Sequence, residues 1–261
     1  MASNSALQPV TVRGWRAGFG NIFRKENRDW WGTKAWLVQA IIWTAILIGI
    51  LATILFAQTD DGGLDMFGGR WVMGVTIFFA VGGIALSIGA VIMGQEEVLD
   101  EKQSGTAAWI LSKPVSRTAF ILAKIAANAL GILIIMILLE GALAYILLSI
   151  SRGQPLNLLP YLAALGVLYL NVMFYFLLSF MFSAATDSRG AAIGIPMAVL
   201  FGYQFIVGIA PWTLEITPWG LTNPGSGSVG LGNAVAALLA LGRPVSPLPI
   251  IATRLWCVSY S

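Results

Sequence analysis

Long apolar runs separated by short polar stretches dominate this sequence, and they decide what it can fold into. Five runs are long enough to cross about 30 Å of hydrocarbon as helices. We predict transmembrane spans at about residues 36–57, 71–94, 121–150, 159–185 and 190–210. Only 10% of the 261 residues are charged and 57% are hydrophobic, whereas soluble domains carry about 25% charged residues. The sequence therefore predicts an all-α polytopic membrane protein with five clear spans.

The two ends of the chain depart from this pattern. Residues 1–35 predict a tail and an interfacial amphipathic helix, with aromatic residues toward lipid and basic residues toward phosphates. An ordinary basic juxtamembrane tail is the alternative. In the domain at 36–261, the Gly-, Pro- and Ser-rich residues 211–249 predict a re-entrant-like region. Residues 250–261 start like a span but are too short to cross, so we expect an incomplete, truncated sixth span.

The basic residues predict the orientation of the chain. With the N-terminus in the cytoplasm, eleven Lys and Arg residues fall on the inner side, and three or four fall outside. Such a bias is typical of multi-pass proteins of the cell membrane. Residues 95–124 are therefore predicted to be cytoplasmic and 211–249 extracellular.

Residues 95–124 are the one long polar segment between two spans. The segment carries four acidic and four basic residues, a density of charge that hydrocarbon does not accommodate. Gly105 and Thr106 interrupt the run of charges. An apolar group around Trp109 follows, and Pro114 ends this apolar group. This order of features predicts a short helix that docks into a partner protein, since aromatic residues are favoured anchors at interfaces. The alternative is a loop whose charges are simply solvated.

The sequence lacks the residues and motifs that several classes of function require. The chain has no His and a single Cys, which excludes metal sites built on His or Cys clusters. It has no phosphate-binding GxxxxGK[ST] loop and no HExxH or G-x-S-x-G motif. A net charge of +3 is too small to indicate a nucleic-acid partner. We therefore expect no enzyme activity, no metal and no cofactor in this chain.

Glu140 is the only acidic residue well inside a predicted span. An ionisable residue at that depth is a functional candidate, because a charge in hydrocarbon costs at least a few kcal/mol. Glu140 is therefore a candidate for a substrate path. A position in the outer third of the span, reached by water, is an equal alternative.

The polar segment resembles the signature between spans two and three of ABC-2 family permeases, and is most similar to the branch of the nitrous-oxide reductase maturation permease. Three pieces carry this resemblance: Glu97-x-x-x-Glu101-Lys102-x-x-Gly105-Thr106, then Ile110 to Arg117, and then Lys124. It implies the architecture of a type V exporter-like permease, which works as a dimer. It also implies separate ATPase subunits, which bind ATP-Mg and grip a coupling helix. The residues assigned to this docking are Glu97, Asp100, Glu101, Lys102, Gly105, Thr106, Trp109, Leu111, Pro114 and Arg117.

The function predicted from these features is the permease subunit of an ATP-driven ABC transporter, with export as the direction that the resemblance implies. Its expected partners are cytoplasmic ABC ATPase subunits, a second permease in a homo- or heterodimer, and membrane lipid. The alternative is a membrane anchor or assembly subunit that recruits a cytoplasmic partner without moving a substrate. Apolar spans with one acidic residue do not identify the substrate.

Overall fold

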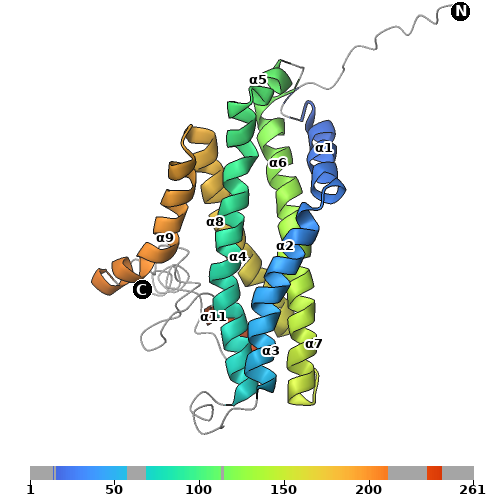
Figure 1. Cartoon of the computed structure of the whole chain (residues 1–261), viewed down its shortest axis with the longest axis vertical. Helices are drawn as coiled ribbons and strands as arrows, with labels where there is room; N and C mark the ends of the chain where they lie inside the picture. The colour runs from blue at the N-terminus through green and yellow to red at the C-terminus, as the bar shows by residue number, and fades with distance from the viewer. Residues whose placement is uncertain (1–13, 15, 58–68, 113–114, 211–233, 243–261) are drawn as a thin grey trace, which may run out of the picture.

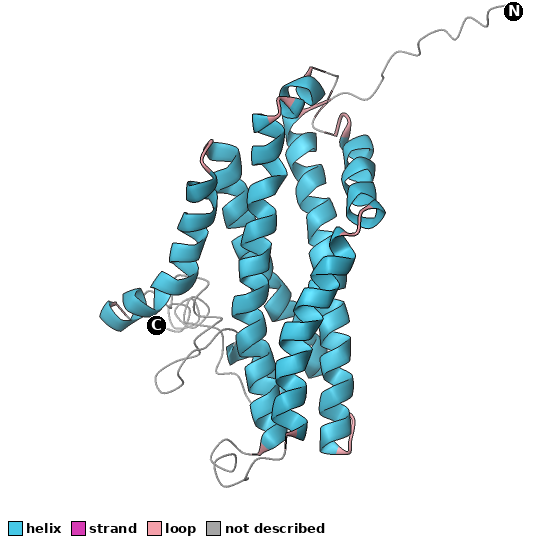
Figure 2. Ribbon diagram, viewed as in Figure 1, coloured by secondary structure: helices cyan, strands magenta, loops and turns pink. Residues whose placement is uncertain are grey.

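The computed structural model describes residues 14, 16–57, 69–112, 115–210 and 234–242. Helices make up this part of the chain, and no strand occurs in it (Figures 1 and 2). The α-helices are α1 (Phe19–Gly32), α2 (Ala35–Trp43), α3 (Gly49–Phe56), α4 (Arg70–Gln103), α5 (Thr106–Leu111), α6 (Arg117–Gly131), α7 (Glu140–Arg152), α8 (Leu158–Ala185), α9 (Arg189–Ile209) and α11 (Ala234–Ala240). Two π-helical segments, η1 (Thr44–Ile48) and η4 (Ile132–Leu139), join α2 to α3 and α6 to α7.

Four helical runs of the described residues are long and apolar enough to cross a membrane. They are Trp36–Phe56, Arg70–Gln103, Arg117–Arg152 and Leu158–Ala185. The first and fourth match the predicted spans within a residue or two. The second and third extend well beyond their predictions, because both helices continue into the polar segment.

The fifth predicted span is not among these four runs. It coincides with α9, which has 21 residues and contains Pro196, and the apolar stretch found among its described side chains is Arg189–Gly202. Figure 1 shows α9 leaning away from the bundle instead of running parallel to α4. The described residues therefore show four helices long and apolar enough to span, and the fifth span stays a prediction.

The predicted amphipathic helix is present as α1, but its apolar side packs against protein. Ile22 is buried with Phe120 and Ala123 of α6, and Phe19 and Phe23 pack around them. Figure 1 shows α1 alongside α6 near α5. The periodicity predicted the helix, part of its apolar side contacts α6, and the expected contact with lipid stays a prediction. A contact with the apolar side chains of α6 removes these residues from water, as a contact with lipid would.

Helices α4 and α8 form the centre of the bundle. Helices gain no hydrophobic free energy by leaving lipid for each other, so small residues and close packing hold them together. A Cβ atom at Gly94 of α4 would lie 2.7 Å from the backbone oxygen of Phe176 in α8. Nearer the opposite end, Phe79 packs edge-on against Tyr161, whose hydroxyl donates to the backbone oxygen of Gly141 at 2.7 Å.

Helix α11 is the described piece of the region predicted to be re-entrant. It is too short to cross a membrane, and it packs against α8 and α4. Ala236 and Ala237 belong to the main buried core. The remainder of 211–249 and the whole of 250–261, with the predicted sixth span, lie outside the described residues.

Candidate functional site

The polar segment that the sequence singled out forms one end of the bundle, called here the α5 end (Figure 1). Helix α4 continues through it to Gln103, and Gly105 then turns the chain with a φ of 76°. The short helix α5 follows, and Ser116 caps α6 by accepting a hydrogen bond from the backbone N–H of Ala119 at 3.0 Å. A glycine at the turn suits this φ, which other residues rarely adopt. The segment is thus two helix ends and a short helix, because the helices of the second and third spans continue past residues 94 and 121 into it.

A buried cluster of charges joins three helices at this end. Lys124 of α6 is its centre, with a side chain only 3% exposed. The Lys124 ammonium lies 3.2 Å from Glu26 of α1, 3.3 Å from Glu97 and 3.2 Å from Glu101 of α4. Lys25 adds a second cation, 3.0 Å from Glu26 and 3.2 Å from Glu101. Such a cluster ties α1 to α4 and α6, because a buried charge requires its partners.

The charges of this cluster also act on Lys25, which lies outside the spans. Burial would lower the pKa of Lys25, but hydrogen bonds and attraction from Glu26 and Glu101 outweigh it and raise the pKa above its ordinary value. Lys25 therefore stays protonated at neutral pH and contributes a full positive charge.

The opposite side of the same α4 end is held by a second set of contacts. Asp100 pairs with Arg189 at 2.5 Å, and Lys102 pairs with Asp187 at 2.7 Å. Lys102 also donates to the backbone oxygens of Ala184 and Thr186 at the C-terminus of α8. A cation suits that position, since the last carbonyls of a helix carry partial negative charge. The end of α4 is thus held between α1 and α6 on one side and the α8–α9 turn on the other.

The structure divides the residues predicted for docking into two groups. Glu97, Asp100, Glu101 and Lys102 form ion pairs within the chain. The exposed group consists of Gly105, Thr106, Trp109 and Arg117. Trp109 has 65% of its side-chain surface exposed. The side chain of Leu111 and the whole of Pro114 lie outside the described residues.

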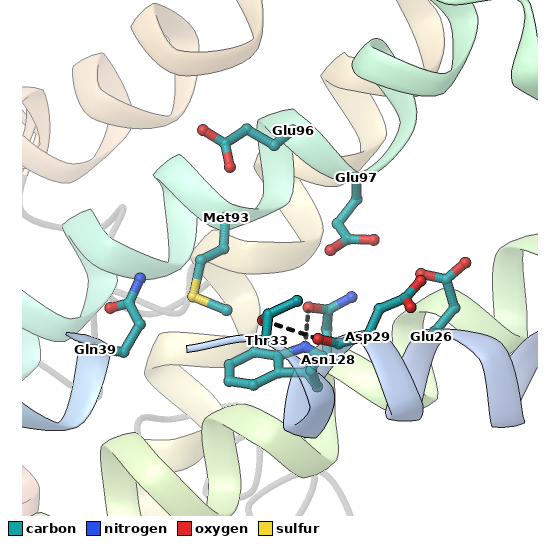
Figure 3. Close-up of a pocket in the computed structure, with 9 residues that line it drawn as sticks. Glu26, Asp29, Thr33, Gln39, Met93, Glu96, Glu97 and Asn128 are labelled. Atoms are coloured by element: carbon teal, nitrogen blue, oxygen red, sulfur yellow. Dashed lines mark hydrogen bonds between the residues drawn. The ribbon is translucent and has the colours of Figure 1, made fainter. Parts of the chain in front are cut away.

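A cavity of about 240 Å³ lies between α1 and α4 next to the charge cluster. Figure 3 shows carboxylates on both of its sides, Glu26 and Asp29 from α1 and Glu96 and Glu97 from α4. Trp30 forms a wall, and its indole N–H donates to the side-chain oxygen of Asn128 at 2.8 Å. Four carboxylates therefore line the cavity, and two of them, Glu26 and Glu97, are paired with Lys124.

Comparison with known families shows which family the chain belongs to. The family model described as ABC-2 family transporter protein matches residues 20–238, which is well over half of the chain. The chain is an ABC-2 family protein. This membership indicates a multi-pass membrane component of an ABC transporter, in a family whose permeases are typically non-catalytic and partner with ABC ATPase subunits. The comparison with curated proteins returned no match.

The second site predicted in this ABC-2 protein, Glu140, is fully buried. Its Oε1 accepts a hydrogen bond of 2.7 Å from the hydroxyl of Thr44, while Oε2 is buried with no partner among the described residues. Thr44 begins η1, and Glu140 directly follows η4, so the hydrogen bond joins the two π-helical segments. π-Helical turns occur frequently at functional sites. The assignment of Glu140 to a substrate path stays a prediction.

Sequence reasoning missed half of the charge cluster and the cavity wall. Glu26, Lys25 and Trp30 fell within the amphipathic helix predicted in residues 1–35, and Lys124 was named only as part of the family signature. The spacing held a signal, since Ile22 and Glu26 are four apart and both are buried in α1. An acidic residue on the apolar face of a helix needs a buried cation, and Lys124 is the one basic residue inside the predicted spans.

Proposed function

We propose that this chain is the permease subunit of an ATP-driven ABC transporter, coupled to separate ATPase subunits at the α5 end. The proposal rests on how the helices and ion pairs of the α5 end are arranged. Helix α5 projects beyond the bundle with Trp109 exposed, on a helix end held by ion pairs on two sides (Figure 1). An exposed aromatic residue is the kind of anchor that protein interfaces use.

The finer features of the proposal rest on the sequence. We place the N-terminus and the α5 end in the cytoplasm of a cell-membrane protein because of the positive-inside bias. Export, a homo- or heterodimer and kinship with the nitrous-oxide reductase maturation branch rest on the motif at 97–124. Within this proposal Trp109, Thr106 and Arg117 touch the ATPase. Glu97 and Glu101 act indirectly, because they fix the position of the helix that carries α5.

Co-purification tests the docking. The tagged full chain is expressed with its neighbouring genes, and the amount of bound ATPase is measured for the wild type and for Thr106→Ala with Trp109→Ala. The control is Arg152→Gln, at the opposite end of the bundle. We expect ATPase with the wild type and the control and a loss of at least about tenfold with the double variant, since interface anchors contribute 2 kcal/mol or more.

Two results would contradict the proposal in different ways. Equal ATPase with all three proteins, or none with any, would remove α5 as the docking element. A bound ATPase whose nucleotide state changes no distance among the spans would favour the anchoring subunit over the transporter.

A further inference from the structure

Helices α4 and α8 run parallel to each other and are joined by polar contacts in one constant register. Three side chains of α8 each donate to the backbone oxygen of the α4 residue 88 positions earlier. The three contacts are Asn171 to Gly83 at 3.2 Å, Ser179 to Val91 at 2.7 Å and Ser183 to Gln95 at 2.8 Å. The two serines are buried completely.

Ser183 differs from the other two in what else it bonds. Its hydroxyl also accepts a hydrogen bond of 3.0 Å from the backbone N–H of Leu99. The carbonyl of Gln95 and the N–H of Leu99 are the two groups of a single i→i−4 pair of α4. A hydroxyl from another helix therefore bonds both members of one helical hydrogen bond.

Ser179, one helical turn before Ser183 on α8, makes a different set of hydrogen bonds. Its hydroxyl bonds the backbone oxygens of Val91 in α4 and of Ala192 in α9, at 2.7 and 3.0 Å. It contacts two acceptors and no N–H of α4. Ser179 thus fastens three helices together, whereas Ser183 offers α4 a substitute for one of its own hydrogen bonds.

A substitute hydrogen-bond partner lowers the free energy needed to break one i→i−4 hydrogen bond in a buried helix. Opening the Gln95–Leu99 hydrogen bond would normally leave a buried carbonyl and a buried N–H without partners, which is costly. With Ser183 in place both groups stay bonded. Helices bend at points where a side chain enters the i→i−4 ladder.

The surroundings leave room for such a bend. The cavity between α1 and α4 is lined on the α4 side by Met93, Glu96 and Glu97, at the level of this hydrogen bond (Figure 3). Close-packed interiors resist displacement, so an adjoining cavity sets the direction in which α4 bends. Gln95 itself is 3% exposed, and its side-chain oxygen is buried without a partner in the described part of the chain.

We propose that residues 94–99 of α4 form a hinge, with Ser183 as the residue that positions it, and that the α5 end pivots there toward α1. The hinge itself follows from the contacts of this chain. Its use in transmitting ATPase motion to the spans rests on the proposed function.

Electron–electron distance measurements on the full chain in nanodiscs test the hinge. With Cys257 replaced by Ser, spin labels are placed at Gln103 and at Ile41 of α2, two exposed positions, and in a second sample at Gln103 and Leu170 of α8. The arm from Gln95 to Gln103 is about 12 Å long, so a bend of about 20° moves its end by about 4 Å. We expect two populations in the wild type, one with the shorter distance to Ile41.

The variants separate a hinge from general loosening. Ser183→Ala should reduce the bent population about tenfold, as expected for the loss of one buried hydrogen bond, and Ser183→Cys should give an intermediate value. Ser179→Ala should keep the wild-type distribution. A single unchanged distance in all four proteins, or equal effects of the two alanine variants, would overturn the hinge.

Adding the co-purified ATPase with and without a non-hydrolysable nucleotide separates the two proposals. A shift of the wild-type populations with nucleotide, lost in Ser183→Ala, supports the hinge and its use in coupling. Two populations that ignore the ATPase would retain the hinge and contradict the coupling role.

Discussion

The replacement of Lys124 by Met tests the buried charge cluster that fastens α1 to the bundle. The Lys124 ammonium contacts Glu26, Glu97 and Glu101 at 3.2–3.3 Å, and its side chain is almost fully buried. Its loss leaves three carboxylates with Lys25 as their remaining partner. Removing one member of a buried pair costs about 3–5 kcal/mol. Because Lys25 is half exposed and still contacts two of the carboxylates, we expect about 3 kcal/mol.

The assay is the free energy of unfolding of the full chain in mixed micelles, followed by tryptophan fluorescence, together with protease cleavage next to α1. Arg189→Met is the control, because its pair with Asp100 is about half exposed on both sides and is expected to contribute about 0–1 kcal/mol. Adding Glu97→Gln to Lys124→Met should recover part of the loss, since it removes an unpaired charge. Equal losses for Lys124→Met and Arg189→Met, or no recovery in the double variant, would refute the reasoning.

Three further changes have defined outcomes. Gly94→Ala should lower the free energy of unfolding by about 1–3 kcal/mol, because its Cβ would lie 2.7 Å from a backbone oxygen of α8; Gly166→Ala, which meets nothing within 4 Å, should not lower it. Gly105→Ala should cost about 1–2 kcal/mol at the turn, given its φ of 76°, as measured against the same Gly166 control. Glu140→Gln keeps an acceptor for Thr44, so we expect assembly at wild-type yield and slower transport in reconstituted vesicles. Unchanged transport would remove Glu140 from the candidate site.

The sequence predicted the helices of this chain better than their ends. Apolar runs located four of the spans because the length of hydrocarbon to be crossed is fixed. Hydropathy falls at Gly94, yet α4 runs on to Gln103, since backbone hydrogen bonding continues wherever no residue breaks it. The interruption of the charges at Gly105 and Thr106 coincides with the turn between α4 and α5, where Gly105 has a φ of 76°. The end of a span and the end of a helix are therefore separate properties.

The contacts of the candidate site were harder to predict than its location. Glu97 and Glu101 share a helix face by their spacing, but spacing does not show whether that face meets a partner protein or Lys124. Ser179 and Ser183 carry no charge and fit any membrane helix, so nothing in the sequence marked their bonds to α4. Only the close approach of α4 and α8 distinguishes them.

The two sets of contacts on the α4 end differ in strength, and this difference gives the proposed bend a direction. The contacts toward α1 and α6 meet at a lysine 3% exposed, whereas the Asp100–Arg189 pair on the other side is about half exposed. Exposed pairs contribute about 0–1 kcal/mol and are screened by salt, but buried pairs are screened much less. Under load at α5, the side facing α8 and α9 should therefore separate first, and the end of α4 should move toward α1, into the cavity between the two helices. Raising the ionic strength from 0.1 to 1 M should increase the bent population in the wild type, and an unchanged population would show that the exposed pairs do not restrain the hinge.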